Sequence, residues 1–273
     1  GALAGGLLPK EIVALQEDDA LSAFAGQMVG GAGAHDTAAH HDSVVQGYIS
    51  GARRLGVTCL AGAEVTGIHV AGGRVRGVLT TDGEIATPVV VNAAGPWAGQ
   101  IGAMAGVEVP VVPVRRQIAV TTAIPQLPAD FPFVIDFAQS LYFHREGPGL
   151  LTGMSKPDEP PGFDQRVDHD WEMAHFEAAM ARLPLLGDVG ISSRWAGLYE
   201  VTPDAHPIIG SVPELPGFYC VAGFSGHGFM HGPACGLLLA EEIMDGKAHS
   251  LDISSLRLSR FREGKPVVEY NVV

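Results

Sequence analysis

Residues 217–242, Gly-Phe-Tyr-Cys-Val-Ala-Gly-Phe-Ser-Gly-His-Gly-Phe-Met-His-Gly-Pro-Ala-Cys-Gly-Leu-Leu-Leu-Ala-Glu-Glu, decide the fold of this 273-residue chain. The apolar run Phe218–Ala222 predicts a buried strand, and the apolar stretch Pro233–Met244 has the length of a helix. The loop between them contains three glycines, at positions 223, 226 and 228. Such a loop presents bare N–H groups at the positive end of the helix dipole. The segment therefore predicts a site for a negatively charged group.

A second junction of this kind lies earlier in the chain, where Asn92-Ala93-Ala94-Gly95-Pro96-Trp97 follows the predicted buried strand Val89–Val91. Its small residues allow a ligand to approach the backbone closely. Pro96 suits the first turn of a helix that we expect to reach about Ala105. Open α/β sheets bind ligands at strand–helix junctions of this kind. A tight packing turn is the alternative interpretation of this junction taken alone.

Both junctions resemble flavin signatures of the D-amino acid oxidase superfamily. Gly223-Phe224-Ser225-Gly226-His227-Gly228-Phe229 is similar to the segment that lies along the flavin ring, and Asn92–Trp97 is similar to the second signature. Within the superfamily, the likeness is greatest to sarcosine oxidases and to the β-subunits of amino acid dehydrogenases. The resemblance implies an FAD-dependent oxidoreductase for the C–N bond of an amino acid or N-methyl amine, such as sarcosine, proline or glycine. An ordinary strand–loop–helix connection remains the alternative for Gly223–Phe229 alone.

The resemblance also implies roles for individual residues. The implied FAD-binding residues are Val65, Ala93, Ala94, Gly95, Trp97, Gly197, Phe224, Ser225, Gly226, His227, Gly228, Phe229 and Met230. The implied substrate residues are Arg116, Tyr142 and Tyr199, and the implied catalytic residues are Tyr199, His227 and Met230. For His227 the alternative is a packed loop histidine, and for Tyr199 it is a core tyrosine.

Two positions depart from the pattern of monomeric sarcosine oxidases. Gly197 stands where those enzymes carry the cysteine that tethers the flavin, so we expect non-covalent FAD at this position. Met230 stands where they carry a lysine implicated in oxygen activation. This favours a dehydrogenase, and it resembles the β-subunits that work in heteromeric complexes, so a partner subunit is possible. The electron acceptor stays open.

The expected fold class is mixed α/β (α+β). Residues 1–108 and 191–273 are expected to form an incomplete Rossmann-like FAD-binding domain, and residues 109–190 an inserted antiparallel-sheet domain that binds the substrate. The family begins with a Gly-x-Gly-x-x-Gly unit that holds the FAD pyrophosphate. Gly31–Asp36 begins this pattern and breaks it, so we interpret it as a loop and expect the true unit to precede Gly1.

Shorter patterns predict the other elements. Apolar spacing predicts helices over residues 10–25, 44–55 and 171–183. Alternation predicts a meander of three strands across residues 65–87, with a hairpin turn at Asp82-Gly83. Further predicted strands cover residues 57–60, 111–122, 133–137, 140–144 and 150–154.

Composition limits the partners. With 17 basic and 30 acidic residues the net charge is −13, which argues against binding to nucleic acid or to an anionic membrane. No apolar run is long enough for a membrane span. Three cysteines in apolar contexts and no cleavable signal pattern indicate a cytoplasmic protein.

Histidine spacing does not match a zinc motif, for example at His35, His40 and His41 or at His169 and His175, so we expect no metal. Two other functions stay open at this point. One is a non-catalytic remnant or scaffold subunit that cannot hold FAD alone. The other is a flavin dehydrogenase for hydroxy acids.

Overall fold

The computed structural model describes residues 14–16 and 34–268, and the side chains of residues 44–268. The fold is mixed α/β, as the sequence predicts. Its helices are α2 (Ala34–Arg54), α3 (Ala98–Met104), α4 (His169–Arg182), α5 (Gly228–Asp245) and α6 (Ser259–Arg262). Short 3-10 turns are η1 (Gly95–Trp97), η2 (Pro184–Asp188) and η3 (Ser254–Leu256). Among the helices of these ranges, none has the length and apolar character that crossing a bilayer requires.

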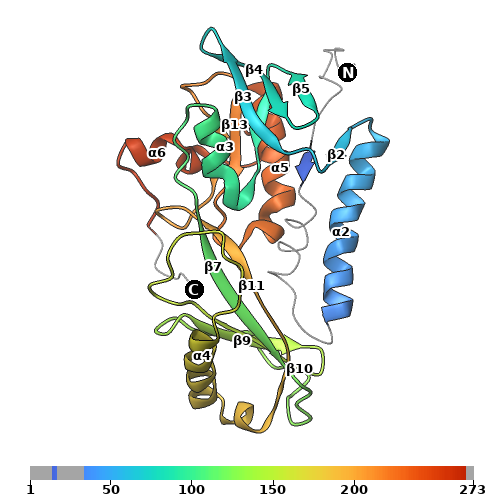
Figure 1. Ribbon diagram of the computed structural model, residues 1–273, viewed down its shortest axis with the longest axis vertical. Coiled ribbons are helices and arrows are strands. Elements are labelled where there is room, and N and C mark those ends of the chain that lie inside the picture. The colour runs from blue at the N-terminus through green and yellow to red at the C-terminus, as the bar shows by residue number, and fades with distance from the viewer. Residues whose placement is uncertain (1–13, 17–33, 269–273) are drawn as a thin grey trace.

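A three-stranded sheet lies at the centre of the upper half of the molecule (Figure 1). Strand β13 (Phe218–Ala222) pairs in parallel with β6 (Val90–Asn92) and antiparallel with β12 (Ile208–Ser211). The parallel pair brings together the two strands that precede the flavin-like junctions. Because both strands run in the same direction, both junctions lie at the same edge of the sheet.

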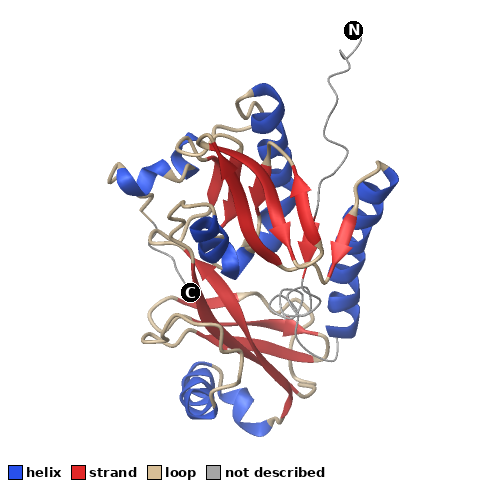
Figure 2. Cartoon of the chain, turned by 45° about the horizontal axis from the view of Figure 1, so that its top comes forward, coloured by secondary structure: helices blue, strands red, loops and turns tan. Residues whose placement is uncertain are grey.

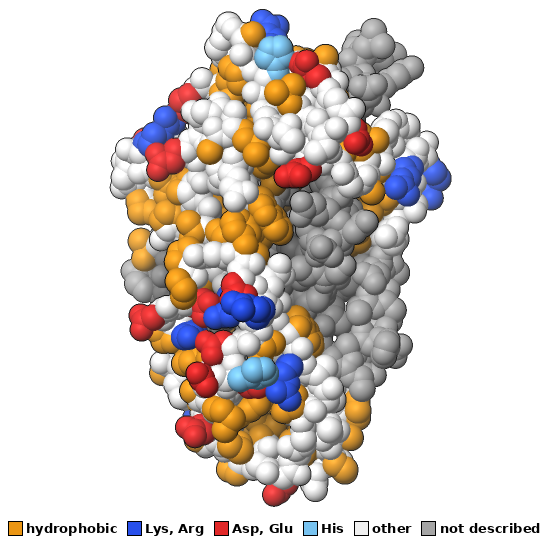
Figure 3. All heavy atoms as spheres, in the orientation of Figure 1, with side chains coloured by type: hydrophobic (Ala, Val, Ile, Leu, Met, Phe, Trp, Pro, Cys, Tyr) orange, Lys and Arg blue, Asp and Glu red, His pale blue; other side chains and the backbone are white. Residues whose placement is uncertain are grey.

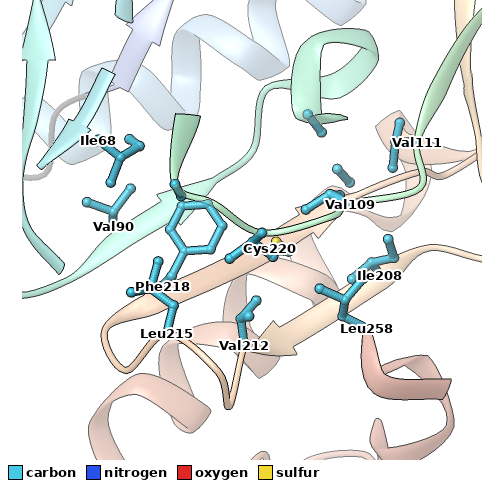
Figure 4. Close-up of a cluster of buried hydrophobic side chains, with 14 of the residues drawn as sticks. Ile68, Val90, Val109, Val111, Ile208, Val212, Leu215, Phe218, Cys220 and Leu258 are labelled. Carbon is cyan, nitrogen blue, oxygen red and sulfur yellow. The ribbon is translucent and has the colours of Figure 1, made fainter. Parts of the chain in front are cut away.

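Alternation along β13 gives this sheet two buried faces. Phe218, Cys220 and Ala222 belong to the main core cluster, and Val221 packs into a second cluster with residues of α5 such as Leu238. Figure 4 shows Phe218 and Cys220 beside Val90 of β6 and Ile68 of the meander. Both faces of the sheet are therefore covered, which explains the continuous apolar run in the sequence.

The meander covers one side of this core. Strands β3 (Val65–Ala71), β4 (Arg74–Thr80) and β5 (Gly83–Ala86) pair antiparallel in sequence order, as predicted. Val75 of β4 is fully buried against the core, and its N–H donates to the carbonyl of Pro216. The strand pair β1 (Ala14–Gln16) and β2 (Cys59–Ala61) lies beside this region, next to α2.

The lower half is a five-stranded antiparallel sheet with the order β11-β7-β10-β9-β8 (Figure 2). The strands are β7 (Val112–Thr121), β8 (Val134–Asp136), β9 (Leu141–Glu146), β10 (Gly149–Met154) and β11 (Ile191–Val201). Helix α4 covers one face, where Leu141, Phe143 and Leu150 pack against Ala179. His175 of α4 is buried against Thr152, with 2.9 Å between Nε2 and Oγ1, and burial lowers its pKa to about 4.

The paired strands β7 and β11 connect the two halves. They stay in antiparallel register from Thr121 with Ile191 to Val112 with Val201, with one irregularity near Ser193. Figure 1 shows this pair extending from the lower sheet up to the central one. The sequence-based boundary at residue 190 places β11 with the cofactor domain, yet β11 pairs along its length with β7 in the lower sheet. The division into two domains stays a prediction.

Three expectations need correction. The predicted helix over residues 10–25 is a strand at Ala14–Gln16, because these residues pair in parallel with Cys59–Ala61, and its remainder lies outside the described residues. Residues 34–36 of the predicted loop Gly31–Asp36 belong to α2. Helix α5 begins at Gly228 rather than at Pro233, so Pro233 lies inside the helix, where its missing N–H removes one intrahelical hydrogen bond.

A buried ion pair fixes the C-terminal segment to the turn after β11. The guanidinium of Arg260 donates from Nε and Nη2 to the two oxygens of Asp204, at 2.8 and 2.9 Å. Their side chains are 3% and 2% exposed. Burial raises the pKa of Asp204, but the hydrogen bonds from Arg260 and from the amide of Val267 outweigh it and hold the pKa at about 2.

We expect Asp204→Asn to lower the free energy of unfolding by about 3–5 kcal/mol, because Arg260 then lies buried without a counter-charge. Urea unfolding at pH 7 measures this, with Arg166→Met, at an exposed pair, as the control that leaves the midpoint unchanged. The contribution of Asp204 is present above the unfolded-state pKa of about 3.9 and is lost as the pH falls through about 2. Equal midpoints for the two variants would contradict this account.

Candidate active site

Residues 93–97, here called the first signature loop, follow β6. Buried Asn92 holds this loop at both ends: its Nδ2 donates to the carbonyl of Ala98 at 2.9 Å, and its Oδ1 accepts from the amide of Ala94 at 3.3 Å. Gly95 has a φ of +49°, in the left-handed region that disfavours a side chain. Asn92 therefore fixes the conformation of the first signature loop through these two hydrogen bonds, so the residues of the loop can contact a ligand.

Residues 223–227, here called the second signature loop, connect β13 to α5. Gly223, Ser225 and Gly226 all have positive φ, at +86°, +50° and +98°. A serine in this region carries strain of about 1–3 kcal/mol, which is found mostly at functional sites. Its Oγ is buried and has no hydrogen-bond partner among the described residues. The loop thus has an unusual backbone conformation, and the Oγ of Ser225 is free to hydrogen-bond to a ligand.

The start of α5 fits a negatively charged ligand. No side chain caps this helix at His227, and its first turn contains no acidic residue. Uncapped N–H groups at a helix N-terminus favour negative charge, such as the pyrimidine edge of a reduced flavin. With the strained Ser225 beside it, this helix start provides donors and an open backbone, so the residues present fit the flavin of FAD.

One face of the lower sheet presents the implied substrate residues toward these loops. In register, Gly197 of β11 pairs with Arg116 of β7, so they share a face, and Tyr199 lies two positions further along the same face. Tyr142 of β9 lies on the same face. Its ring packs over Gly153, its register partner in β10, where an added Cβ would lie 2.5 Å from the ring. The strand register thus brings three residues from three strands together.

Charge interactions link these three side chains. The guanidinium carbon of Arg116 lies 5.4 Å from the centroid of the Tyr199 ring. Burial lowers the pKa of Arg116, while attraction to Tyr199 and Tyr142 opposes that shift. Burial raises the pKa of both tyrosines, so both phenols stay protonated near neutral pH. The Nε of Arg116 is buried without a hydrogen-bond partner among the described residues.

The second signature loop closes directly on this face. A Cβ at Gly226 would lie 2.5 Å from Cζ of Tyr199, so only glycine permits this approach. The backbone carbonyl of Glu200, the next residue, accepts from the amide of Ser225 at 3.1 Å, and its side chain contacts Phe224. Sequence reasoning missed Glu200; the available signal was an acidic residue directly after the uncharged run Trp195–Tyr199.

The other sequence-predicted residues lie at varied distances from this centre. Val65 begins β3 and packs against the main core cluster. The ring of Trp97 stacks on Phe163 of the inserted region, with centroids 5.4 Å apart. His227 is exposed, and its ring stacks on that of His231 at 5.9 Å. Met230 is 61% exposed in the first turn of α5. Ala93 and Ala94 lie in the first signature loop, Gly228 and Phe229 begin α5, and Gly197 is buried.

Histidines and carboxylates do not assemble a metal site within residues 14–16 and 34–268. His175 is engaged with Thr152, and His169 lies 3.1 Å from Glu172. The side chains of His35, His40 and His41 lie outside the described set. On the face drawn in Figure 3, acidic and basic side chains are mixed over the lower half. Arg115 of β7 forms such a group with Glu159, Asp164 and Asp168.

Comparison with known proteins indicates the same class of protein as the two signature loops, an FAD-dependent oxidoreductase. The sequence profile of the DAO family, described as FAD dependent oxidoreductase, matches residues 3–242. The chain belongs to this family. The match includes both signature loops and the strands β7 and β11.

Relatives in this family act on small amino acids according to their names. Mitochondrial sarcosine dehydrogenase of Homo sapiens is 37% identical over 222 residues, which cover 76% of this chain and 24% of that protein. Mitochondrial dimethylglycine dehydrogenase of Rattus norvegicus is 31% identical and covers 75% of this chain and 26% of its own length. The chain thus spans about a quarter of these two relatives.

A solved structure in the family has a similar fold. L-proline dehydrogenase from P. horikoshii superposes with a TM-score of 0.73 at 33% identity, over 79% of this chain and 58% of that one. The family membership and this likeness agree on an FAD-dependent oxidoreductase fold.

We expect Gly226→Ala to weaken FAD binding about tenfold, because left-handed backbone alone costs an alanine about 1–2 kcal/mol. The new methyl group would also displace the Tyr199 ring. Quenching of flavin fluorescence measures the affinity. Gly236→Ala, in α5 with nothing within 4 Å of the added Cβ, is the matched control. Equal affinities for both variants would show that the second signature loop does not contact the flavin.

Proposed function

We propose that this protein is an FAD-dependent dehydrogenase that oxidises the C–N bond of a small amino acid or N-methyl amino acid. The observation that carries the proposal is the arrangement of Arg116 and Tyr199 on one sheet face, with Gly226 of the second signature loop packed against the tyrosine. The names of the relatives, sarcosine dehydrogenase and L-proline dehydrogenase, support the same substrate class.

In this proposal the two signature loops hold the cofactor. Backbone groups of residues 93–95 and 226–228 would hold the ring, and the start of α5 would stabilise negative charge on it. When bound, FAD accepts the hydride equivalent from the carbon next to the substrate nitrogen. Gly197 offers no side chain for a covalent bond, so the cofactor is non-covalent at this position.

Arg116, Tyr142 and Tyr199 bind and orient the substrate. The guanidinium of Arg116 pairs with the substrate carboxylate, because a half-buried cation whose Nε lacks a partner among the described residues favours an anion. The protonated phenols of Tyr142 and Tyr199 donate hydrogen bonds and line the site. His227 lies at the loop end of α5, and its backbone N–H holds the loop by donating a hydrogen bond to the carbonyl of Phe224 at 3.0 Å.

Several broader assignments belong to the same proposal. Residues 1–108 and 191–273 form the cofactor domain, and residues 109–190 the substrate domain. The proposal includes a heteromeric partner subunit and leaves the electron acceptor open, and the compartment is the cytoplasm. Net negative charge supports the absence of a nucleic-acid partner.

Anaerobic reduction of the bound flavin tests the proposed function. Sarcosine or L-proline should bleach the oxidised flavin band, and Arg116→Met should raise the KM or Kd for these substrates roughly 10–100-fold, the worth of a charge-assisted hydrogen bond. Arg182→Met, an exposed arginine of the same sheet domain, is the control. A flavin that neither amino acid reduces would overturn the substrate class, and unchanged constants in the Arg116 variant would remove its role.

Position 230 tests the choice between dehydrogenase and oxidase. We expect Met230→Lys to speed reoxidation by oxygen on the order of tenfold, because a nearby unit charge is worth about 1–4 kcal/mol and stabilises superoxide. Met244→Lys, at the other end of α5 and similarly exposed at 58%, is the matched control. Stopped-flow reoxidation with air-saturated buffer gives the rates. Rapid oxygen use by the unmodified protein, unaffected by the lysine, would contradict this assignment.

A further inference from the structure

One carboxyl group lies buried between the two signature loops. Glu200 of β11 is 6% exposed. Its Oε1 accepts a hydrogen bond from the amide of Phe224 at 3.3 Å, and its backbone carbonyl accepts from the amide of Ser225 at 3.1 Å. The residue therefore holds the second signature loop through both its side chain and its backbone.

The other oxygen of the same carboxyl faces the first signature loop. A Cβ at Gly95 would lie 3.5 Å from Oε2 of Glu200, so this oxygen is in van der Waals contact distance of that position. Among the described residues, Oε2 has no hydrogen-bond partner. Turn η1, which contains Gly95, contacts both β7 and β11. One side chain thus extends from the strand pair to both loops.

No cation in the described part of the chain pairs with Glu200. Arg115 lies on the same face of β7, two positions from Pro113, the register partner of Glu200, but it is engaged with Glu159 at 2.9 Å and with the carbonyl of Arg166. The second signature loop contributes one titratable side chain, His227, and the first contributes none. Burial raises the pKa of Glu200, and the amides of Gly223 and Phe224 oppose that shift.

Burial without a cation favours the neutral acid over the carboxylate, against the opposing effect of the two amide donors. A buried charge without a cation costs several kcal/mol, whereas a protonated carboxyl keeps an acceptor for the Phe224 amide. In the neutral acid one oxygen carries the proton and the other accepts from the Phe224 amide. A carboxamide has the same shape and provides the same acceptor oxygen.

We propose that Glu200 is a positioning residue that fixes the spacing of the two signature loops around the flavin ring, and that it does so as a neutral carboxylic acid. The proposal rests on the proposed function only in taking the loops to contact FAD. It assigns no proton transfer to Glu200, which acts through the backbone of Gly95 and Phe224.

The first test compares Glu200→Gln, Glu200→Asp and Glu200→Ala in the holoprotein by FAD titration. Glutamine preserves the length and the acceptor, so its Kd for FAD stays within about threefold of the wild type. Alanine removes the contact, and aspartate is too short to reach both loops, so each weakens FAD roughly 10-fold or more. Glu172→Gln, at a buried glutamate on α4 whose carboxylate accepts from Arg194 at 3.0 Å, leaves the Kd unchanged.

The second test measures urea unfolding of the apoprotein against pH. An acid with a raised folded-state pKa loses stability as the pH rises above its unfolded-state value of about 4.3 and until it passes the folded-state pKa. The difference in stability between Glu200→Gln and the wild type should therefore grow in favour of glutamine between pH 5 and pH 8. A purely structural contact would give a constant difference.

The outcomes separate the two proposals. A full-length wild-type protein that binds no FAD would contradict the proposed function. A wild-type protein that binds FAD as tightly as Glu200→Asp and Glu200→Ala would overturn the positioning role alone. A glutamine variant that becomes less stable than the wild type as the pH rises would show that Glu200 is a carboxylate. If Glu200→Ala does not fold, the aspartate and glutamine variants decide the question.

Discussion

The antiparallel pairing of β7 with β11 is the constraint on which the rest of the structure depends. The two strands are about 70 residues apart in sequence, yet their register fixes which side chains share a face. On one face this places Arg116 next to Gly197 and Tyr199, and on the other it directs Glu200 toward the signature loops. A slip of one residue would exchange these faces and separate the substrate residues from the cofactor loops.

Two buried acidic residues of this fold, Asp204 and Glu200, have different charge partners. Asp204 is fully paired with Arg260 and remains ionised, which fixes the C-terminal segment to the turn after β11. Glu200, four residues earlier, has no cation partner among the described residues, and its carboxyl faces the backbone amides of the second signature loop. The ion pair of Asp204 with Arg260 stabilises the fold, whereas Glu200 lies where the two signature loops meet. This contrast between neighbouring acids is what marks Glu200 as a residue of the site.

Local patterns in the sequence predicted much of the fold. Alternation identified the meander, and the apolar run at Phe218–Ala222 identified β13, because both patterns reflect burial of single faces or of whole strands. The helix predicted for residues 10–25 is wrong at Ala14–Gln16, since pairing with β2 is a non-local contact. The start of α5 was placed late because glycine and proline are poor helix formers, and their loop contacts were not visible in the sequence.

The candidate site was predictable only in part. The glycine motifs marked both loops, but the strand register that brings Arg116, Tyr142 and Tyr199 together is a long-range property. Trp97 is predicted to lie at the cofactor, and its ring stacks on Phe163 of the inserted region. Roles of individual residues toward FAD and substrate stay predictions.

A crystal structure of the FAD complex tests the central claim most directly, namely that the two signature loops meet over the β7–β11 pair to form the flavin site. The account predicts that the isoalloxazine ring lies against Gly226 and the first signature loop, with its pyrimidine edge at the start of α5 and Arg116 on the substrate side. A ring located away from either loop, or an electron density for FAD on the α4 face of the lower sheet, would contradict it.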